Sequence, residues 1–263
     1  MDETHRESES PRRIMAVVLT HNAPDSLARC LRAIADQTTP PDGLLVVDNA
    51  SHPVAALPPP DSYPIPAHVV RSDVNTGPAG GYATALAEFL KSDFLHAWVL
   101  DDDMLPEQAC LERLWSVASS HPERAFVFPL SQQVDGSIGV WPSWCGFVVS
   151  RQIVEAVGLP MEELFWWAED TEYLQWRIPK AGYPQQVVHD AVVHHEAVRQ
   201  GGGVPLWKYY YESRNMLYVH LYVKRRIGRY PRNLARLVAR SLLRERKGRL
   251  RRLAVIAHGL FDG

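Results

Sequence analysis

The feature that most constrains the fold is a series of short apolar runs in the first half of the chain, each of which ends in polar side chains. The runs cover residues 14–20 (IMAVVLT), 44–47 and 97–100. Because they are apolar at consecutive rather than alternate positions, they are typical of strands buried on both faces of a parallel sheet. None approaches the ~20 apolar residues that a membrane-spanning helix needs.

Amphipathic helices are predicted between these runs, because apolar residues recur there at helical spacing. The expected helices cover residues 26–37, capped by Asp25 or Ser26, 81–91, and 106–120 with Pro106 in its first turn; a further strand is expected over 69–71. This alternation predicts an α/β fold with a Rossmann-like, mostly parallel sheet flanked by helices.

The second half of the chain is less regular but carries the same types of element. Strands are expected over residues 125–129, 147–149 and 187–193, and helices over 152–157, 170–180 and 206–223. In parallel α/β sheets, ligands bind beyond the carboxyl ends of the strands. The polar clusters Thr20–Asn22, Asp48-Asn49 and Asp101–Asp103 all fall at such ends. We therefore expect the binding site at that edge of the sheet.

The triplet Asp101–Asp103 packs three carboxylates into three positions. Because unpaired carboxylates repel one another, a bound cation is a natural way to hold them together. Mg²⁺ and Mn²⁺ prefer oxygen ligands and keep positions open for phosphates. In an extended segment Asp101 and Asp103 point to the same side, which makes them the expected metal-binding pair. The alternative is a solvated acidic turn before the next helix.

A second unusual segment places two tryptophans beside three acids. Trp166 and Trp167 stand next to Glu169, Asp170 and Glu172. Large rings favour sugar stacking, and an apolar environment raises the proton affinity of a carboxylate. The alternative is a helix whose acids lie in the first turn and whose tryptophans lie in the core.

Two smaller features lie at expected element ends. His194 and His195 follow the last strand, and an imidazole there would complete an oxygen-rich Mn²⁺ site, unless it is structural. The turn at residues 75–81 (NTGPAGG) opens a helix, where free backbone N–H groups can meet phosphate. It lacks the spacing of the common dinucleotide-binding and P-loop motifs, so a tight connection is the alternative.

Cysteine usage and the first residues bear on location. Cys30, Cys110 and Cys145 are too few and too far apart for a disulfide framework or a CxxC zinc site, which fits a reducing cytoplasm. Residues 1–12 are acidic and polar, without the apolar core of a signal peptide, and we expect them to be flexible. These features predict a cytoplasmic protein.

Together the motifs resemble those of the family 2 glycosyltransferases, which use nucleotide-sugar donors and have the GT-A fold. The resemblance runs from about Ile14 to Tyr222. Its landmarks, in order, are VVLTHN, LLVVDNAS, NTGPAGG, WVLDDDM, GFVVSR, GLPMEELFWWAEDTEYLQWRIPKAGY and a histidine after the next strand. The segment YYYESRNMLY is similar to the tyrosine-rich Arg-Asn helix of related rhamnosyl- and galactofuranosyltransferases.

The resemblance implies a role for each cluster. Donor-binding residues would be Thr20, Asn22, Asp48, Asn75, Gly77, Gly80, Asp101 and Asp102, with Asp48 at the nucleobase or ribose. Mn²⁺ or Mg²⁺ would be held by Asp101, Asp103 and His194, with His195 as the alternative to His194. The catalytic base would be Asp170, assisted by Glu169, and the acceptor would meet Trp166, Trp167 and Glu172.

The implied activity is an inverting, metal-dependent transfer of a sugar from a UDP- or dTDP-linked donor to a hydroxyl of a glycan, lipid-linked or small-molecule (natural-product) acceptor. Galactofuranose and rhamnose are the favoured sugars. A single carboxylate base suffices for inversion. One alternative is a sugar nucleotidyltransferase, although its glycine-rich opening loop with an arginine is absent. The other is a catalytically inactive module that binds nucleotides or sugars.

The C-terminal segment differs in charge from the rest of the chain. Residues 224–252 hold 13 Lys and Arg and one acid, a balance of about +12, whereas the remaining residues carry about −14. Its helical periodicity predicts a basic amphipathic segment over 224–263, after a catalytic domain over 13–223 with a nucleotide-binding half (13–105) and an acceptor half (106–223). Such a segment suits peripheral contact with an anionic membrane at the inner face of the plasma membrane, or packing on the acidic body. No nucleic-acid motif is present, and a homo-oligomer remains open.

Overall fold

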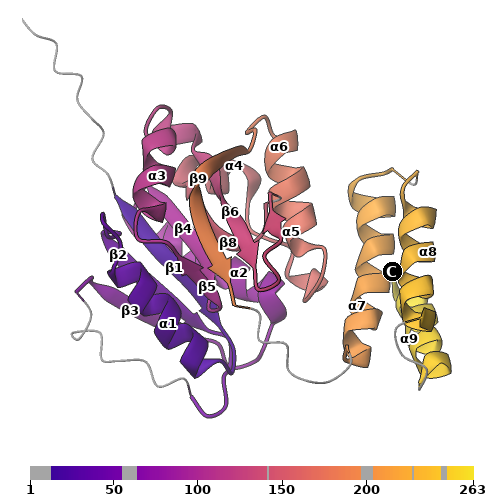
Figure 1. Cartoon of the computed structure of the whole chain (residues 1–263). Helices are drawn as coiled ribbons and strands as arrows, with labels where there is room; N and C mark the ends of the chain where they lie inside the picture. The colour runs from indigo at the N-terminus through magenta and orange to yellow at the C-terminus, as the bar shows by residue number, and fades with distance from the viewer. Residues whose placement is uncertain (1–12, 55–63, 141, 197–203, 227, 244–247) are drawn as a thin grey trace, which may run out of the picture.

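The computed structural model describes residues 13–54, 64–140, 142–196, 204–226, 228–243 and 248–263. Within these residues the strands form one sheet in the order β3-β2-β1-β4-β8-β6-β9-β5, with β7 paired to β6. Helices cover both faces of the sheet, and α7, α8 and α9 form a separate helical unit beside it (Figure 1). The proline-rich composition of residues 53–66 predicts a loop, and most of these residues lie outside the described part of the chain.

The first four strands are parallel and bring the predicted polar clusters to one edge. They are β1 (Ile14–Thr20), β2 (Gly43–Asp48), β3 (Ala67–Arg71) and β4 (His96–Asp101). The register pairs Thr20 with Asp48 on one side of β1 and Leu19 with Asp101 on the other. Because β1 and β2 are buried at every position, they match the strand type expected from the apolar runs.

The helices between these strands cover opposite faces. Helix α1 (Pro24–Ala35) packs Leu27 and Leu31 against one face, together with α3 (Cys110–Ala118). Helix α2 (Gly77–Lys91) packs Leu86 and Phe89 against the other. Two local predictions are wrong. Neither Asp25 nor Ser26 caps α1, because the helix begins at Pro24, where proline suits the first turn. Pro106 is not in a helix either.

The second half adds antiparallel strands to the sheet. Its elements are β5 (Met104–Pro106), a 3₁₀ turn (Pro122–Arg124), β6 (Phe126–Gln133), β7 (Ile138–Gly139), β8 (Cys145–Ser150), α4 (Arg151–Val157), a 3₁₀ turn (Glu162–Leu164), α5 (Glu169–Glu172), a π-helical turn (Tyr173–Arg177), α6 (Ile178–Lys180) and β9 (Gln186–His195). Pro106 lies in β5, which pairs with β9 and places the triplet 101–103 beside the end of β9.

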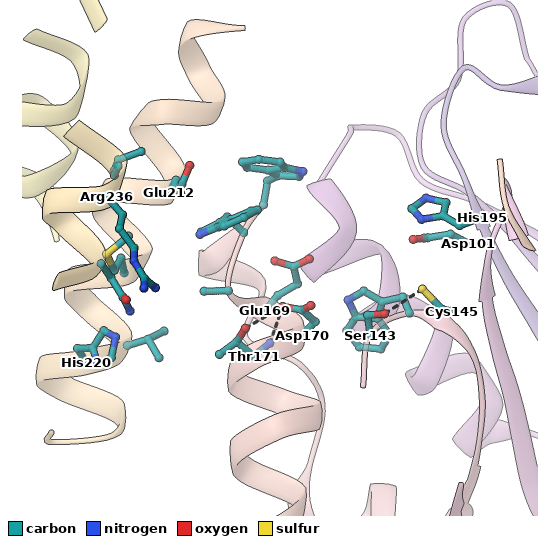
Figure 2. A pocket seen from close by; sticks show the side chains of 18 of the residues that line it. Asp101, Ser143, Cys145, Glu169, Asp170, Thr171, His195, Glu212, His220 and Arg236 are labelled. Carbon is teal, nitrogen blue, oxygen red and sulfur yellow. Dashed lines mark hydrogen bonds between the residues drawn. The ribbon is translucent and has the colours of Figure 1, made fainter. Parts of the chain in front are cut away.

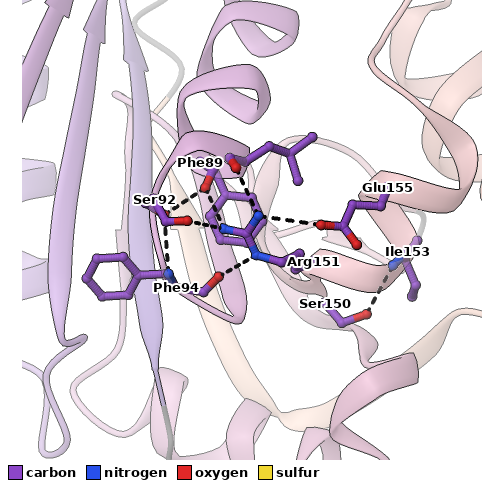
Figure 3. A network of polar contacts seen from close by, with 8 residues as sticks. Phe89, Ser92, Phe94, Ser150, Arg151, Ile153 and Glu155 are labelled. Carbon is purple, nitrogen blue, oxygen red and sulfur yellow. Dashed lines mark hydrogen bonds and ion pairs between the residues drawn. The ribbon is translucent and has the colours of Figure 1, made fainter.

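Arg151 ties the end of α2 to the start of β4. Its guanidinium donates hydrogen bonds to the carbonyls of Phe89, Leu90, Ser92 and Phe94 at 2.6–3.0 Å, and Figure 3 shows how it is surrounded by them. A cation at this position satisfies carbonyls that a helix leaves unpaired at its C-terminus. The contact fixes α2, and with it the glycine turn at its other end, relative to β4.

The C-terminal helices pack on one another. Helix α7 (Leu206–Tyr218) continues as a π-helical turn (Val219–Val223) and is followed by α8 (Tyr230–Leu243) and α9 (Arg249–Asp262). Tyr209, Leu237 and Ile256, one from each helix, form their shared core. A Cβ on Gly259 would lie 2.5 Å from the Tyr210 carbonyl, so α9 approaches α7 closely. In the described residues no helix combines the length and apolarity that crossing a bilayer requires.

Candidate active site

The acidic triplet begins where β4 ends, at the edge predicted from the sequence. The Thr20 hydroxyl, at the end of the neighbouring strand, donates to Asp102 Oδ2 at 2.6 Å, and the Tyr82 hydroxyl donates to Asp101 Oδ1. Burial, reinforced by the charge of Asp103, raises the pKa of Asp101 well above its usual range. Burial also raises the pKa of Asp102 to about 6. Burial and mutual repulsion therefore disfavour full ionisation of the triplet.

Two cavities share Asp101 and Trp166 as lining residues. The smaller, of about 400 Å³, is lined by Leu19, Thr20, His21, Asn49, Asn75, Gly77, Pro78, Asp101, Asp102, Asp103, Phe165, Trp166 and Trp207. The larger, of about 760 Å³, contains Asp101, His195, Trp166, Trp167, Glu169 and Asp170 in its lining (Figure 2). The triplet and the acidic pair 169–170 thus face connected space, as the sequence motifs imply.

The glycine turn forms one wall of the smaller cavity through Asn49. The Asn49 amide donates to Asn75 Oδ1 at 3.2 Å and to the Gly77 carbonyl at 3.0 Å, and its oxygen accepts from the Thr76 amide at 3.0 Å. Gly77 has φ +68°, and a Cβ there would lie 2.1 Å from the Phe165 carbonyl oxygen. Only glycine fits where this turn presses on the 165–168 loop. Sequence reasoning missed Asn49, although its cluster was singled out.

Three predicted donor residues do not line either cavity. The Asp48 side chain is buried. Its Oδ2 pairs with the guanidinium of Arg71 at 2.8 Å, and its Oδ1 accepts a hydrogen bond from the Ser51 amide at 2.9 Å. The Asn22 side-chain oxygen accepts from the His52 amide at 2.6 Å. Gly80 lies inside α2 against Thr76. Next to Asp48, Asn49 does line the smaller cavity.

The loop before α5 is strained and is held by one side chain of α7. Phe165, Trp167 and Ala168 have φ values of +56°, +75° and +71°, which non-glycine residues rarely adopt. The amide of Asn215 donates to the carbonyls of Leu164, Trp166 and Trp167 at 2.6–2.8 Å. Asn215 belongs to the Arg-Asn motif of the sequence, which signalled the helix but not this contact.

Glu169 and Asp170 begin α5 and line the larger cavity. Burial, and then repulsion from Asp170, raises the pKa of Glu169 to about 8. The indole of Trp144 lies near Glu169 and partly offsets this rise in pKa. In the described residues, however, neither Trp144 Nε1 nor Glu169 Oε2 has a hydrogen-bond partner. Asp170 Oδ1 accepts from the amide of Thr171 at 2.5 Å, and burial raises its pKa as well. Two neighbouring carboxyls with elevated proton affinity suit proton transfer near neutral pH.

Glu172 does not reach this cavity, contrary to the sequence expectation. It is buried and forms a two-point ion pair with Arg177, with oxygen–nitrogen distances of 2.5 and 2.9 Å. Its side chain is directed toward the π-helical turn that carries Arg177. The ion pair ties α5 to the turn that follows it.

The two histidines at the end of β9 point to opposite sides, as neighbours on a strand must. His195 Nε2 lies 3.1 Å from Asp103 Oδ2 and the residue lines the larger cavity. His194 Nε2 instead lies 3.4 Å from Glu107 Oε1, outside both cavities. The structure thus places His195, the alternative, beside the acidic triplet, and His194, the preferred residue, beside Glu107.

The donor set fits a hard divalent cation in kind. Asp101, Asp103 and His195 offer carboxylate oxygens and one imidazole. Burial, and then repulsion from Asp103, raises the pKa of Asp101, and a bound cation would favour its ionised form. Among the described residues, no three His, Cys, Asp or Glu side chains already converge as ligands. Phosphate oxygens of a ligand would have to complete the site.

The chain is similar to a known protein family and to mycobacterial enzymes. The model of Glycosyl transferase family 2 matches residues 15–201. Galactofuranosyltransferase GlfT1 of Mycolicibacterium smegmatis is 30% identical over 205 residues, which cover 65% of this chain and 67% of the relative. Its namesake from Mycobacterium tuberculosis is 39% identical over 93 residues, or 34% of this chain and 30% of the relative.

Solved structures resemble the whole chain at low sequence identity. Residues 1–349 of Staphylococcus aureus TarS in complex with UDP give a TM-score of 0.60 at 16% identity, covering 94% of this chain and 81% of that one. The Pyrobaculum calidifontis mannosyltransferase PcManGT, in complex with GDP-Man and Mn²⁺, gives 0.59 at 16% identity, with coverages of 95% and 74%. At such identities the likeness concerns the fold.

Proposed function

The chain belongs to glycosyl transferase family 2 and is a glycosyltransferase with the GT-A fold, and from that premise we propose that it transfers galactofuranose from a UDP- or dTDP-linked donor to an acceptor hydroxyl with inversion. One observation carries the proposal: Asp101 and Asp170 line the same cavity. The sugar is proposed from the galactofuranosyltransferases that the chain resembles along 205 residues. Rhamnose, the other favoured sugar, has no such support.

The nucleotide half of the donor is assigned to the smaller cavity. There the side chains of Thr20, Asn49 and Asn75 offer hydroxyl and amide groups that suit phosphate and ribose oxygens. The backbone amides of Thr76, Gly77 and Ala79 at the start of α2, which the sequence predicts to be free for phosphate, are instead hydrogen-bonded within the protein. Asp101, Asp103 and His195 would hold Mn²⁺ or Mg²⁺ at the junction with the larger cavity. The chemistry supplied by such an ion when bound is neutralisation of charge on the leaving diphosphate.

The acceptor half is assigned to the larger cavity. Trp166 and Trp167 offer ring faces for an acceptor sugar, and their rings lie 5.2 Å apart. Asp170 would take the proton of the attacking hydroxyl. Glu169, whose raised pKa keeps it mostly protonated at neutral pH, would leave Asp170 as the carboxylate base. A single base of this kind supports direct displacement and therefore inversion.

The test combines nucleotide binding with turnover. UDP and dTDP, each with and without Mn²⁺, should raise the melting temperature of the wild-type chain, and a ligand at 100 times its Kd adds about 2.7 kcal/mol. Asp170→Asn should keep this shift and lose roughly 10²- to 10⁴-fold in transfer from the nucleotide sugar. Full activity in Asp170→Asn, or no shift with any nucleotide, would contradict the proposal.

The metal assignment is tested by a matched pair of histidine variants. His195→Ala should weaken the Mn²⁺-dependent part of the nucleotide shift, because it removes the imidazole beside Asp103. His194→Ala, one residue away and directed at Glu107, should leave that part unchanged. The reverse pattern would restore His194 as the ligand.

We also propose that the basic C-terminal segment makes peripheral contact with an anionic membrane. Its inner face is occupied by packing on α7, but Leu243 and Leu250, at the facing ends of α8 and α9, are 79% and 83% exposed. Apolar side chains among arginines are typical of surfaces that bind anionic lipid.

A further inference from the structure

The larger cavity has a second wall that the family match does not include. The match ends at residue 201, whereas Lys224, Asn233, Arg236 and Arg240 line the cavity from the C-terminal helices. Figure 2 shows Arg236 and Glu212 on these helices, Glu169 and Asp170 on α5, and His195 with Asp101 farther along, on the side of α5 away from Arg236. The acidic pair therefore separates this wall from the residues assigned to the donor.

The wall carries excess positive charge. Arg240 is paired with the carboxylate of Glu212, which also lines the cavity. Arg236 has no carboxylate partner among the described residues. Lys224 is half-buried, and desolvation lowers its pKa while the charges of Glu172 and Asp170 act in the opposite direction. Three cationic side chains and one carboxylate, that of Glu212, line this end of the cavity, so it favours an anion.

Lys224 and Arg236 differ in the interactions that they already make within the protein. Lys224 feels the charge of Asp170 and lies 5.5 Å from the centroid of the Trp176 ring, so part of its role is local. The Arg236 side chain extends from α8 toward the cavity in Figure 2. A guanidinium in this position can make two parallel hydrogen bonds to a phosphate.

From these observations we infer that the far wall of the cavity, centred on Arg236, is a subsite for a phosphate group carried by the acceptor. This inference rests on the proposed function and adds a substrate class to it. The hydroxyl to be glycosylated would lie at Asp170, its sugar against Trp166 or Trp167, and the phosphate at Arg236. Such a phosphate belongs either to a soluble sugar phosphate or to a lipid carrier.

The test measures phosphate binding with the donor site filled. In the presence of saturating UDP and Mg²⁺, glucose 1-phosphate is titrated into the full chain, with methyl glucoside as the uncharged control. Glucose 1-phosphate should bind and methyl glucoside should bind much more weakly. Arg236→Gln should weaken glucose 1-phosphate about tenfold or more, since a charge-assisted hydrogen bond contributes that much. Arg236→Lys, which keeps the charge, should lose less.

Arg232→Gln is the matched control, because Arg232 is exposed on the same helix and does not line the cavity. Farnesyl phosphate in micelles is titrated in the same way, to distinguish a lipid carrier from a soluble sugar phosphate. Whichever probe binds more tightly indicates the source of the phosphate, and loss of that binding in Arg236→Gln supports the subsite. Equal binding to wild type and Arg236→Gln would overturn it. If UDP itself does not bind, the proposed function is contradicted. The subsite is then tested separately, by titrating glucose 1-phosphate into wild type and Arg236→Gln without nucleotide.

Discussion

Glu169 and Asp170 are neighbours in sequence, yet the fold gives them different surroundings. Glu169 is buried against Trp144 at the base of the cavity, whereas Asp170 accepts hydrogen bonds from Thr171 and feels the charge of Lys224. Both surroundings raise the pKa, and the rise takes Glu169 to about 8. When the surroundings of two acids give them different pKa values, one can act as the proton donor and the other as the base.

The raised pKa of Glu169 predicts a pH-dependent stability. Between its ordinary pKa of 4.5 and its folded pKa of about 8, the folded chain holds a proton that the unfolded chain releases. The contribution of Glu169 to stability is therefore present at low pH and lost as the pH rises through about 8. Glu169→Gln should melt increasingly above wild type as the pH is raised from 5 to 8.5, in thermal unfolding followed by circular dichroism.

The control for this experiment is Glu162→Gln, because Glu162 is an exposed acid of the preceding 3₁₀ turn. Its melting temperature should track that of wild type across the same pH range. A constant difference between Glu169→Gln and wild type at every pH would show that Glu169 does not titrate in this window.

At the residue scale, chemistry was predictable from the sequence, but side-chain direction was not. The acidic triplet and Asp170 were found because their residue types and order suffice. His194 was preferred to His195, but the sequence does not show which of two neighbours on a strand faces a given side. Asn49, which follows the end of β2, was not singled out as a donor residue. Only the pairing of β5 with β9 decides which histidine meets Asp103.

At the scale of elements, the 165–168 loop depends on α7 for its shape. Three left-handed residues in four positions would not persist without external contacts. Asn215 supplies them to three carbonyls, while the neighbouring Arg214 contacts the Glu163 carbonyl. The loop delivers both tryptophans and the acidic pair to the cavity, so α7 supports the site through Asn215 and also lines the smaller cavity through Trp207.

Asn215→Ala should therefore lower the free energy of unfolding by about 2–3 kcal/mol, because it leaves buried carbonyls without donors. It should also change the near-UV circular dichroism of Trp166 and Trp167 and reduce turnover. Arg214→Ala leaves the amide of Asn215 and its three carbonyl contacts in place, but removes an exposed bond to the Glu163 carbonyl and a bond of 2.8 Å to Asn215 Oδ1. It is the comparison variant and should have the smaller effect on all three measurements. Equal effects of the two variants would mean that the loop is not held by Asn215.

The elements themselves were predictable where the signal is local. Apolar runs and helical spacing gave β1, β2 and β4, with α1 and α2 between them. The three-residue strand β5 was missed and Pro106 was placed in a helix, because β5 exists only by pairing with β9, about 90 residues later in the chain. The antiparallel pairing of β8 with β4 likewise has no signature in either segment.

At the scale of the whole molecule, charge is distributed unevenly along the chain. The segment 224–252 carries about +12 and the remaining residues about −14. Packing of α8 and α9 on α7 accounts for the apolar inner face of this segment, through Leu237 and Ile256. It does not account for Leu243, Leu250 and Phe261, which are 79–89% exposed. Exposed apolar side chains on a strongly basic surface suggest a negatively charged, partly apolar partner.

The membrane proposal makes this division testable. The full chain should sediment with vesicles of phosphatidylglycerol more than with vesicles of phosphatidylcholine, and added salt should weaken the binding because it screens charge. The double variant Leu243→Ser, Leu250→Ser should bind the anionic vesicles more weakly while keeping its nucleotide-induced thermal shift. Val134→Ser, which removes an apolar side chain that is 76% exposed near the β6–β7 turn, should bind them as wild type does. Equal sedimentation with both kinds of vesicle, or unchanged binding of the double variant, would mean that the charge of the segment serves the cavity and the acidic body rather than a lipid surface.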